Sequence, residues 1–455
     1  MSIFKAYDIR GIVGENLTPA IVTQIGQAIG SEAIAQGPAQ VVVARDGRLS
    51  GLELLTALIT GLQAAGCQVI DIGMVPTPVL YFATYHLNTG NGVMLTGSHN
   101  PPNYNGLKIM IGGEALSGER IQALKTRIDN NELSYGSGTL KKIDIGAAYI
   151  KRITDDIKLT RSFKVIIDAG NGVTGVLAPQ LIRALGCEVV ELFCEIDGHF
   201  PNHHPDPSVP ANLVEMIATV KSENADLGFA FDGDGDRLGV IDAKGNIIWP
   251  DRQMILYATD LLKRHPGAQI IYDVKCSRHL DHAIQQHGGQ PLMWKTGHSL
   301  IKAKMKATGA LLGGEMSGHI FFKERWYGFD DALYTAARLL EILSPDSRLP
   351  EEVFAALPDA ANTPELKLEL EQFGEHFELM QKIRDTFQFE AAVQIATIDG
   401  VRADFPDGWG LVRPSNTTPT LIFRFEADNL AALNRIQAQF RQQLLAIDKQ
   451  LKLPF

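Results

Sequence analysis

The feature that most constrains the fold of this chain is a pattern that occurs three times. In each copy, an apolar run rich in β-branched residues leads through a polar or glycine-containing loop into an amphipathic helix, a glycine and a second apolar run. The first runs cover residues 41–44, 165–168 and 270–273, so the copies begin 124 and 105 residues apart. Solenoid repeats have periods of roughly 20–50 residues. The spacing therefore predicts three related α/β domains.

The same pattern places the elements within each copy. The expected helices and second apolar runs cover residues 51–65 and 67–70, a helix ending at 185 followed by 188–192, and 279–286 followed by 291–294. The runs are continuously apolar, which is typical of strands covered by helices on both faces of a sheet. Residues 364–455 differ, with one expected strand at 421–425 and a long helix from about 429 to 450. They predict a fourth, smaller α+β domain.

Charge and composition exclude several classes of protein. The chain has 455 residues and a net charge of −10, which disfavours nonspecific binding to nucleic acid. It begins without an apolar signal segment and holds no apolar run long enough to span a bilayer. Its four cysteines show no Cys-x-x-Cys spacing, so we expect reduced core residues. These features predict a cytoplasmic protein with neither nucleic acid nor membrane as a partner.

The sharpest motif is an Asp-Gly-Asp-Gly-Asp loop after the apolar run at residues 227–230. It places Asp232, Asp234 and Asp236 at alternate positions separated by glycines. Glycine permits the backbone angles that turn three carboxylates toward one small, hard cation such as Mg2+. Three carboxylates without an ion would repel one another. The loop therefore predicts a metal site.

A second loop, residues 96–102, follows the short apolar stretch at residues 93–95. It contains Ser98 without the Gly-x-Ser-x-Gly elbow of esterases. A serine outside that elbow can be a simple turn residue, or it can carry a phosphoryl group whose charge a cation and nearby basic side chains balance. The residues alone leave both interpretations open.

Two further loops are rich in groups that hydrogen-bond sugars or phosphates. Residues 313–319 follow an apolar run and offer a carboxylate, a hydroxyl and an imidazole from Glu315, Ser317 and His319. Residues 413–419 offer a guanidinium, hydroxyls and backbone amides, a suitable cradle for a phosphate dianion.

Two other enzyme classes compete with a metal-dependent phosphoryl site. Residues 170–175 match the Gly-x-Gly-x-x-Gly fingerprint of dinucleotide-binding domains, with Glu191 ending the next run. The other two copies lack these glycines, so we interpret them as close packing of strand against helix. Asp232 also resembles the nucleophile of a haloacid-dehalogenase-type phosphatase. That family has Thr or Val where this chain has Asp236, which favours metal binding.

Taken together and in this order, the four loops resemble those of the alpha-D-phosphohexomutase family. The similarity runs from residues 7–11 to residues 413–419, nearly the whole chain. The Gly-Glu-Met-Ser-Gly-His form most resembles the bacterial phosphomannomutase/phosphoglucomutase group, because phosphoglucosamine mutases usually carry Gln where Met316 stands. Gly97 stands where many relatives have Ala.

The resemblance implies the architecture of the whole chain. Three similar α/β domains with mixed sheets and a smaller C-terminal α+β domain would surround a central cleft. The expected domains are 1–143 with the phosphoserine loop, 144–246 with the metal loop, 247–360 with the sugar-recognition loop, and 361–455 with the phosphate-binding loop.

It also implies roles for individual residues. Ser98 would be the phosphoserine and, with Asp232, Asp234 and Asp236, would bind Mg2+, while Glu315 and Ser317 would contact sugar hydroxyls. The non-reacting phosphate would be held by Arg413, Ser415, Asn416 and Thr417, with Tyr7 and Lys275 nearby. The transferring group would be surrounded by Arg10, Lys108 and Arg237. The candidates for general acid and base are Lys108, His319 and the substrate-binding His298.

The implied enzyme interconverts hexose 1-phosphates and hexose 6-phosphates of mannose and glucose through phospho-Ser98 and a 1,6-bisphosphate. It would need Mg2+, with glucose 1,6-bisphosphate as activator, and small sugar phosphates as partners of a chain that we expect to be monomeric. A phosphoglucosamine mutase and a Mg2+-dependent phosphatase are the alternatives. A sugar-phosphate sensor would keep the cradle without needing Ser98 or all three aspartates.

Overall fold

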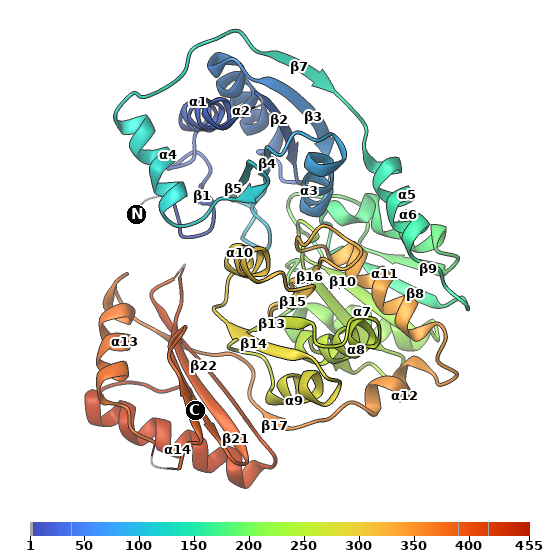
Figure 1. Ribbon diagram of the computed structural model, residues 1–455, viewed down its shortest axis with the longest axis vertical. Coiled ribbons are helices and arrows are strands. Elements are labelled where there is room, and N and C mark those ends of the chain that lie inside the picture. Colours follow the sequence, from blue (N-terminus) through green and yellow to red (C-terminus); the bar gives the residue numbers. More distant parts are fainter. Residues whose placement is uncertain (1–2, 38, 390, 417) are drawn as a thin grey trace.

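A computed structural model of the chain describes residues 3–37, 39–389, 391–416 and 418–455. Four sheets follow one another along the sequence, and each is the centre of one domain (Figure 1). The first domain is drawn in blue to cyan, the second in green, the third in yellow to orange and the fourth in orange to red. The first three domains pair sheets with helices, as the threefold pattern predicts.

The first domain holds a seven-stranded sheet in the order β1-β5-β4-β2-β3-β7, with β6 beside β5. Its strands are β1 (Ile9–Ile12), β2 (Gln40–Arg45), β3 (Gln68–Met74), β4 (Gly92–Leu95), β5 (Tyr104–Ile111), β6 (Glu114–Ala115) and β7 (Thr139–Lys142). Its helices are α1 (Pro19–Gln36), α2 (Gly51–Ala65), α3 (Thr77–His86) and α4 (Glu119–Asp129). Local sequence starts α1, because the Thr18 side chain accepts from the Ile21 amide and Pro19 opens the helix.

The second and third domains have smaller sheets. The second, in the order β12-β11-β10-β8-β9, comprises β8 (Lys164–Asp168), β9 (Glu188–Leu192), β10 (Leu227–Phe231), β11 (Leu238–Asp242) and β12 (Ile247–Ile248), with α5 (Gly146–Asp156), α6 (Ala178–Ala184) and α7 (Val214–Ser222). The third, in the order β14-β13-β15-β16, comprises β13 (Gln269–Asp273), β14 (Gln290–Trp294), β15 (Leu312–Gly314) and β16 (Ile320–Phe322), with α8 (Pro250–Arg264), α9 (Arg278–Gln286), α10 (His298–Thr308), α11 (Ala332–Leu343) and α12 (Pro350–Ala355).

One four-stranded unit is common to these three domains. It appears as β3-β2-β4-β5, β9-β8-β10-β11 and β14-β13-β15-β16, with three parallel strands and a fourth that is antiparallel. The connection from the third strand to the fourth carries the Ser98 loop, the aspartate loop and the Gly-Glu loop, respectively. The prediction of three similar domains with mixed sheets is confirmed, and the three loops occupy equivalent places.

The fourth domain is smaller and its sheet is antiparallel throughout. Its strands are β17 (Ala361–Asn362), β18 (Leu366–Glu369), β19 (Gln394–Ala396), β20 (Val401–Phe405), β21 (Gly408–Pro414) and β22 (Thr420–Ala427), and its helices are α13 (Glu375–Thr386) and α14 (Leu430–Ile447). Its apolar core is separate from that of the other domains. The predicted α+β domain with a strand near residues 421–425 and a long final helix is confirmed.

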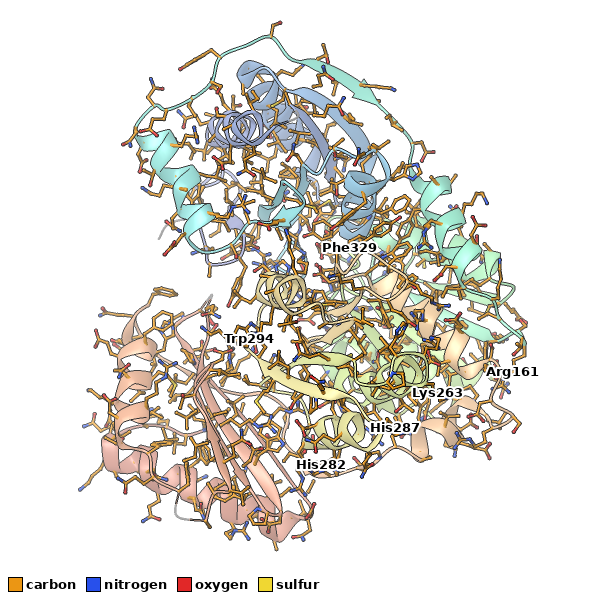
Figure 2. The ribbon with its side chains drawn as sticks, in the orientation of Figure 1. Arg161, Lys263, His282, His287, Trp294 and Phe329 are labelled. Atoms are coloured by element: carbon orange, nitrogen blue, oxygen red, sulfur yellow. The ribbon has the colours of Figure 1, made fainter. Side chains whose placement is uncertain are left out.

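Apolar packing joins the first three domains into one unit. A single core cluster includes Val79 of α3, Ile167 of β8 and Leu340 of α11. Phe329, labelled in Figure 2, packs on Tyr81 of α3 with their ring centroids 5.5 Å apart. The fourth domain meets the third through a much smaller cluster of Val274, Trp409 and Leu411. The fourth domain is therefore the one that can move at the lowest cost in buried apolar area.

Three further observations bear on the sequence analysis. All four cysteines are free and three of them are buried. Among the described residues, no helix is long and apolar enough to cross a bilayer. The expected domain limit at residue 246 would separate β12 from its partner β11. We therefore propose that the second domain extends to residue 248.

Candidate active site

Ser98 lies in the connection from β4 to β5, with its side chain directed at the aspartate loop. Its Oγ donates to Asp232 Oδ2 over 3.0 Å and lies 3.1 Å from His99 Nδ1. The residue is almost fully buried and has a φ of +49°, in the left-handed region that non-glycine residues seldom adopt. Burial, with the charges of Arg237 and Arg10, holds the pKa of His99 well below its usual range. Neutral His99 therefore adds no charge beside the hydroxyl.

The three aspartates of the connection from β10 to β11 are fully buried and converge. Each offers an oxygen within 4.8 Å of the oxygens of the other two. Asp232 Oδ1 accepts from the amides of Gly235, Asp236 and Arg237, which shapes the loop. Among the described residues, Asp234 Oδ1 and Asp236 Oδ1 have no hydrogen-bond partner. Two orphaned, buried carboxylate oxygens beside a third carboxylate fit a small, hard cation such as Mg2+.

Lys108 of β5 reaches the same aspartates from the first domain. Its Nζ donates to Asp234 Oδ2 over 2.6 Å and to Asp236 Oδ2 over 2.5 Å. Burial alone would lower the pKa of Lys108, but these two carboxylates raise it well above its ordinary value. Burial alone would likewise raise the pKa of Asp234, but the Lys108 ammonium lowers it. Lys108 is therefore a cation, able to give a proton or stabilise negative charge, and not a free base.

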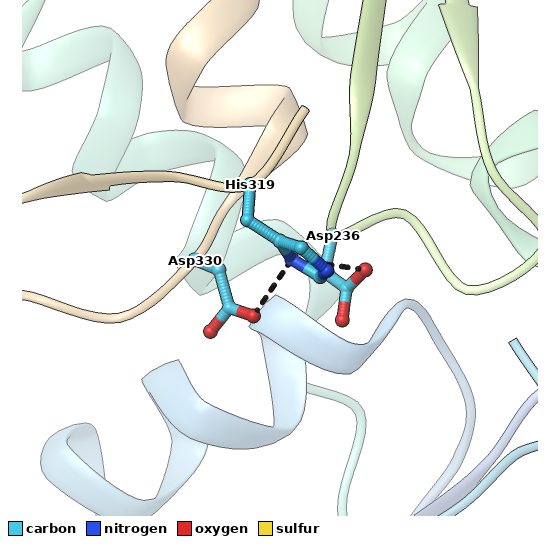
Figure 3. A group of neighbouring side chains, drawn as sticks. All are labelled: Asp236, His319 and Asp330. Atoms are coloured by element: carbon cyan, nitrogen blue, oxygen red, sulfur yellow. Dashed lines mark ion pairs between the residues drawn. The ribbon is translucent and has the colours of Figure 1, made fainter. Parts of the chain in front are cut away.

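Figure 3 shows His319 between two carboxylates. Its Nδ1 lies 3.1 Å from Asp330 Oδ2 and 3.5 Å from Asp236 Oδ1, while Arg237 Nε donates to its Nε2 over 3.0 Å. An arginine can only donate, so Nε2 accepts and the ring proton sits on Nδ1, facing Asp330. Lys302 also donates to Asp330 Oδ1 over 2.7 Å. With the cations Lys302 and Arg237 this close, we interpret the trio as a histidine paired with two carboxylates and not as a second ion site.

His298 begins α10, and its ring stacks on that of His319 at 5.5 Å. Lys302 Nζ donates to His298 Nδ1 over 3.2 Å, which places the ring proton on Nε2. Burial, followed by the Lys302 charge, lowers the pKa of His298 to about 4. His298 is therefore a neutral imidazole that can donate from Nε2.

The Gly-Glu loop connects β15 to β16 and meets the start of α10. Glu315 is buried, and its Oε1 accepts from the Gly297 amide over 2.5 Å. Burial raises the pKa of Glu315. Ser317 is half-buried in the same loop. The loop thus brings a buried carboxylate to the start of α10, next to His298.

The predicted phosphate cradle draws on three domains. Arg413 of β21 pairs with Asp399, with Nε 3.0 Å from Oδ2. Lys275, after β13, pairs with Glu365 over 2.6 Å. Burial alone would raise the pKa of Glu365, but Lys275 lowers it to about 2. Each of these cradle cations therefore already has a counter-charge.

The tip of the cradle reaches the first domain. Tyr7 accepts from the side-chain amide of Asn416 and donates to the Thr296 carbonyl over 3.2 Å. Ser415 is buried and accepts from Thr418. Thr417, which we also predicted for the cradle, lies outside the described residues. Arg10, the other predicted site residue from the start of the first domain, lies beside the Ser98 loop. Its side chain donates to Asn100 Oδ1 of that loop over 2.7 Å.

Comparison with known proteins identifies the family. Four family models match the chain in order, described as Phosphoglucomutase/phosphomannomutase alpha/beta/alpha domain I at residues 1–134, domain II at 147–245, domain III at 249–360 and the C-terminal domain at 361–443. The chain belongs to the phosphoglucomutase/phosphomannomutase family. It is therefore a phosphohexomutase, as its motifs imply.

Members of this family are similar to the chain over its whole length. A phosphomannomutase/phosphoglucomutase from Pseudomonas aeruginosa is 58% identical over 454 residues, covering 100% of this chain and 98% of the relative. A phosphoglucomutase from Neisseria gonorrhoeae is 53% identical and covers 96% of each chain. A crystal structure of a family protein from Burkholderia thailandensis is 54% identical, with a TM-score of 0.95 and coverage of 100% and 99%.

The glycines at residues 170–175, which match a dinucleotide fingerprint, allow close backbone contacts in this phosphohexomutase. A Cβ on Gly172 would lie 3.1 Å from the Cα of Gly233 in the aspartate loop, and one on Gly175 would lie 2.0 Å from the Cys194 carbonyl oxygen. We expected these glycines to let a strand pack against a helix. That expectation was wrong, because Gly172 and Gly175 pack closely against the backbone of loops. Glu191 is exposed and pairs with Arg183.

Several residues of the site carry no local sequence signal. Asp330, Thr77, Glu365 and Asp399 were not predicted. Thr77 opens α3, and its Oγ1 donates to Asp234 Oδ2 over 2.6 Å. Thr77 and Glu365 reach their partners across a domain boundary, whereas Asp330 and Asp399 pair with residues of neighbouring loops or strands in their own domains. Only tertiary structure brings such pairs together, although the Gly-Phe-Asp-Asp sequence at residues 328–331 was a weak signal for a loop carboxylate.

A histidine–aspartate pair holds the segment that contains His203 and Pro205, which contacts the aspartate loop. His203 Nε2 lies 3.0 Å from Asp168 Oδ2, and the neighbouring Pro205 carbonyl accepts from the Gly233 amide. Burial alone would lower the pKa of His203, but the hydrogen bond and charge of Asp168 raise it above 6.5. The pair therefore stabilises the fold fully below pH 6.5, and this contribution is lost as the pH rises through the raised pKa.

We expect His203→Gln to lower the thermal midpoint at about pH 6 and to have a smaller effect at about pH 9. Thermal unfolding of both proteins across this range checks it. His199→Gln is the matched control, because His199 is an exposed histidine that pairs with Asp197 in the same loop and should matter little at any pH. A His203→Gln deficit that is equal at both pH values would contradict the expectation.

Proposed function

We propose that the chain interconverts the 1-phosphates and 6-phosphates of mannose and glucose through phospho-Ser98 and a hexose 1,6-bisphosphate. The observation that carries this proposal is the position of Ser98 Oγ, 3.0 Å from Asp232 Oδ2 where loops of three domains converge. The relatives named for phosphomannomutase and phosphoglucomutase activity support both sugars.

In the proposed reaction, the phosphoryl group leaves Ser98 Oγ and forms a bond with a hydroxyl oxygen of the hexose phosphate. The hydroxyl proton passes to a base, and the oxygen of Ser98 takes up a proton as its bond to phosphorus breaks. The bisphosphate then turns so that its other phosphoryl group is transferred to Ser98 Oγ, which gives up its proton, while the sugar oxygen left behind takes up the proton held by the base. His319 is the base that the geometry favours, because Asp330 faces the proton on Nδ1 and Nε2 can take a second proton once Arg237 turns to the phosphoryl oxygens. Lys108 would stabilise the charge that develops on these oxygens.

Asp232, Asp234 and Asp236 would hold Mg2+, which when bound neutralises charge on the transferring phosphoryl group. Phospho-Ser98 would complete this site. The three carboxylates carry more negative charge than Lys108 and Arg237 can balance once a phosphoryl group arrives. Glucose 1,6-bisphosphate would act as activator by phosphorylating Ser98 in enzyme that has lost its phosphate.

The geometry disfavours the phosphatase alternative. A nucleophilic aspartate needs a free oxygen, but Asp232 Oδ1 accepts from three amides and Oδ2 accepts from Ser98. The hydroxyl of Ser98 is therefore better placed to carry the phosphoryl group.

Two measurements test the proposed function. Intact mass and peptide mapping of the purified protein should show one phosphate on Ser98, and coupled assays should show turnover of both mannose 1-phosphate and glucose 1-phosphate. Phosphate on another residue would contradict the role of Ser98, and turnover of only one sugar would contradict dual specificity.

The cradle gives a further expectation. Arg413 can bind a phosphate through two parallel hydrogen bonds, so Arg413→Ala should cost about 2–3 kcal/mol of transition-state binding, roughly a 30- to 150-fold loss in kcat/KM. Arg435→Ala is the matched control, because Arg435 forms an exposed pair with Asp407 in the same domain. Steady-state kinetics with glucose 1-phosphate compares the variants. An Arg413→Ala enzyme with the kcat/KM of the control would refute the cradle.

A further inference from the structure

Arg48 is a buried cation that the proposed reaction does not use. It lies in the loop after β2, the first loop of the first sequence copy, and only about 1% of its surface is exposed. Burying a guanidinium is expensive unless all its donors are satisfied. The groups that accept hydrogen bonds from Arg48 therefore indicate the role of this residue.

Four of the five N–H groups of Arg48 point at one segment. One terminal nitrogen donates to the carbonyls of Pro101 and Tyr104 over 2.6 and 2.9 Å, and the other to those of Ser98 and Asn100 over 2.9 and 2.5 Å. These carbonyls lie along the Ser98 loop, from the serine itself to the first residue of β5. A single planar guanidinium thus holds both ends of this loop.

Asp46 completes the support on the other side of the serine. It pairs with Arg48 Nε at 3.3 Å and accepts from Thr96 Oγ1 and the Gly97 amide over 2.7 and 3.1 Å. Thr96 Oγ1 in turn accepts from the Ser98 amide over 2.8 Å. The amide and the carbonyl of Ser98 are therefore both held. Such support is what a non-glycine residue at positive φ requires, since that conformation costs about 1–3 kcal/mol.

Gly97 makes room for this arrangement. A Cβ at residue 97 would lie 2.3 Å from Arg48 Cζ and Nε. The guanidinium therefore lies directly against the backbone that precedes Ser98. The space that a Cβ at residue 97 would need is filled by the arginine side chain.

Arg48 also ties the loop to the second domain. The carbonyl oxygen of Ser98, which Arg48 holds, lies 2.4 Å from the place of a Cβ on Gly233, between two of the metal-loop aspartates. The Arg48 guanidinium lies 5.3 Å from the ring centroid of Phe200, also in the second domain. One side chain therefore sets the position of the Ser98 loop against the aspartate loop.

The internal repeat supports a role for this position. In the four-stranded unit common to the first three domains, the equivalent strands β2, β8 and β13 each lead to an aspartate that accepts from the amide two residues later. Asp46 accepts from Arg48, Asp168 from Gly170 and Asp273 from Lys275. The same turn thus presents a cation in the first and third domains. Lys275 faces the cradle, whereas Arg48 faces the Ser98 loop.

We propose that Arg48 is a positioning residue that holds Ser98 in its left-handed conformation and aims its Oγ at the aspartate loop. Arg48 need not touch substrate or the transferring group to do so. The inference rests on the proposed function of Ser98 as phosphoryl carrier.

Arg48→Lys is the variant that tests it. A lysine keeps the charge but cannot hold four carbonyls in a plane. Misplacing a reacting group by about 1 Å costs on the order of 10²-fold in rate. We expect kcat to fall by about 10²-fold with KM changed less than about threefold, because the charged groups of the cradle, Lys275 and Arg413, lie in the third and fourth domains and are untouched. Labelling of dephosphorylated enzyme by phosphate-labelled glucose 1,6-bisphosphate should slow by the same factor.

Two controls separate the possible failures. Label on Ser98 of the wild-type enzyme shows that the carrier role holds, and label elsewhere would mean that the proposed function itself is wrong. Arg338→Lys measures the general effect of changing a buried arginine, because Arg338 is fully buried over Phe322 in the third domain. It should keep the wild-type kcat. A folded Arg48→Lys enzyme with the wild-type labelling rate, or with raised KM and unchanged kcat, would overturn the inference.

If the Arg48→Lys protein does not fold, the Asp46→Asn variant tests the same inference. This substitution removes the counter-charge of Arg48 and keeps an oxygen that can accept from Thr96 and Gly97. We expect it to slow labelling at least about tenfold without raising KM. An unchanged labelling rate in this variant would overturn the inference.

Discussion

Replacing Ser98 with alanine is expected to abolish phosphate labelling and to lower turnover of both sugar 1-phosphates by about 10⁴-fold or more. Without Oγ the enzyme has no atom that holds the phosphoryl group while the sugar turns over. The fold should be unaffected, because alanine and serine meet the same steric limits at a φ of +49°. Labelling with glucose 1,6-bisphosphate, peptide mapping and coupled assays check the result.

Two companion variants sharpen this experiment. Ser31→Ala removes another buried serine of the same domain, remote on α1, and should keep full labelling and turnover. Asp232→Asn tests the competing aspartyl carrier. A serine ester survives purification, whereas an aspartyl-phosphate is an acyl phosphate and hydrolyses readily. Stable label in Ser98→Ala would show that the carrier is another residue.

The second large effect is expected at the metal site. Asp234→Ala should lower kcat by about 10³-fold, since a bound metal ion contributes several kcal/mol of transition-state charge stabilisation. Removing one of three clustered carboxylates also relieves repulsion, so the protein should remain folded. Calorimetric titration with Mg2+, activity assays with and without chelator, and circular dichroism measure these outcomes.

Asp242→Asn is the matched control for Asp234→Ala. Asp242 is a buried aspartate at the far end of β11, where it accepts from the amides of Lys244 and Asn246. Its loss should change stability and leave Mg2+ binding intact. An Asp234→Ala enzyme that binds Mg2+ like the control, or keeps near-native rates in chelator, would refute the metal assignment.

Local sequence was sufficient for the apolar parallel strands of the three repeats and for the loops that follow them, but not for the antiparallel strands β5, β11 and β16 or for most strands of the fourth domain. The run at residues 227–230 is part of β10, and the helix expected at residues 51–65 is α2 (Gly51–Ala65). These elements follow from short-range patterns of apolar residues and from glycines at loop positions. Helix ends were less accurate: the final helix ends at Ile447, and the prediction carried it to residue 450.

Pairs of residues that meet only through folding were beyond such patterns. The carboxylates of Asp330, Glu365 and Asp399 face His319, Lys275 and Arg413, but no spacing rule connects the members of any pair. Arg48 was visible only as one basic residue in a loop. Its role depends on four carbonyls that lie about 50 residues away.

The sequence by itself determined the threefold α/β plan, the smaller fourth domain and the four loops that carry chemistry, because apolar periodicity and glycine placement act within a few residues. Tertiary structure alone decided how these loops meet. Equivalent strand orders place three of them at the same end of three sheets, and packing between domains brings Ser98 to Asp232. Protonation was also decided there, because two neighbouring carboxylates keep Lys108 a cation despite its burial, whereas burial and the Lys302 charge leave His298 neutral.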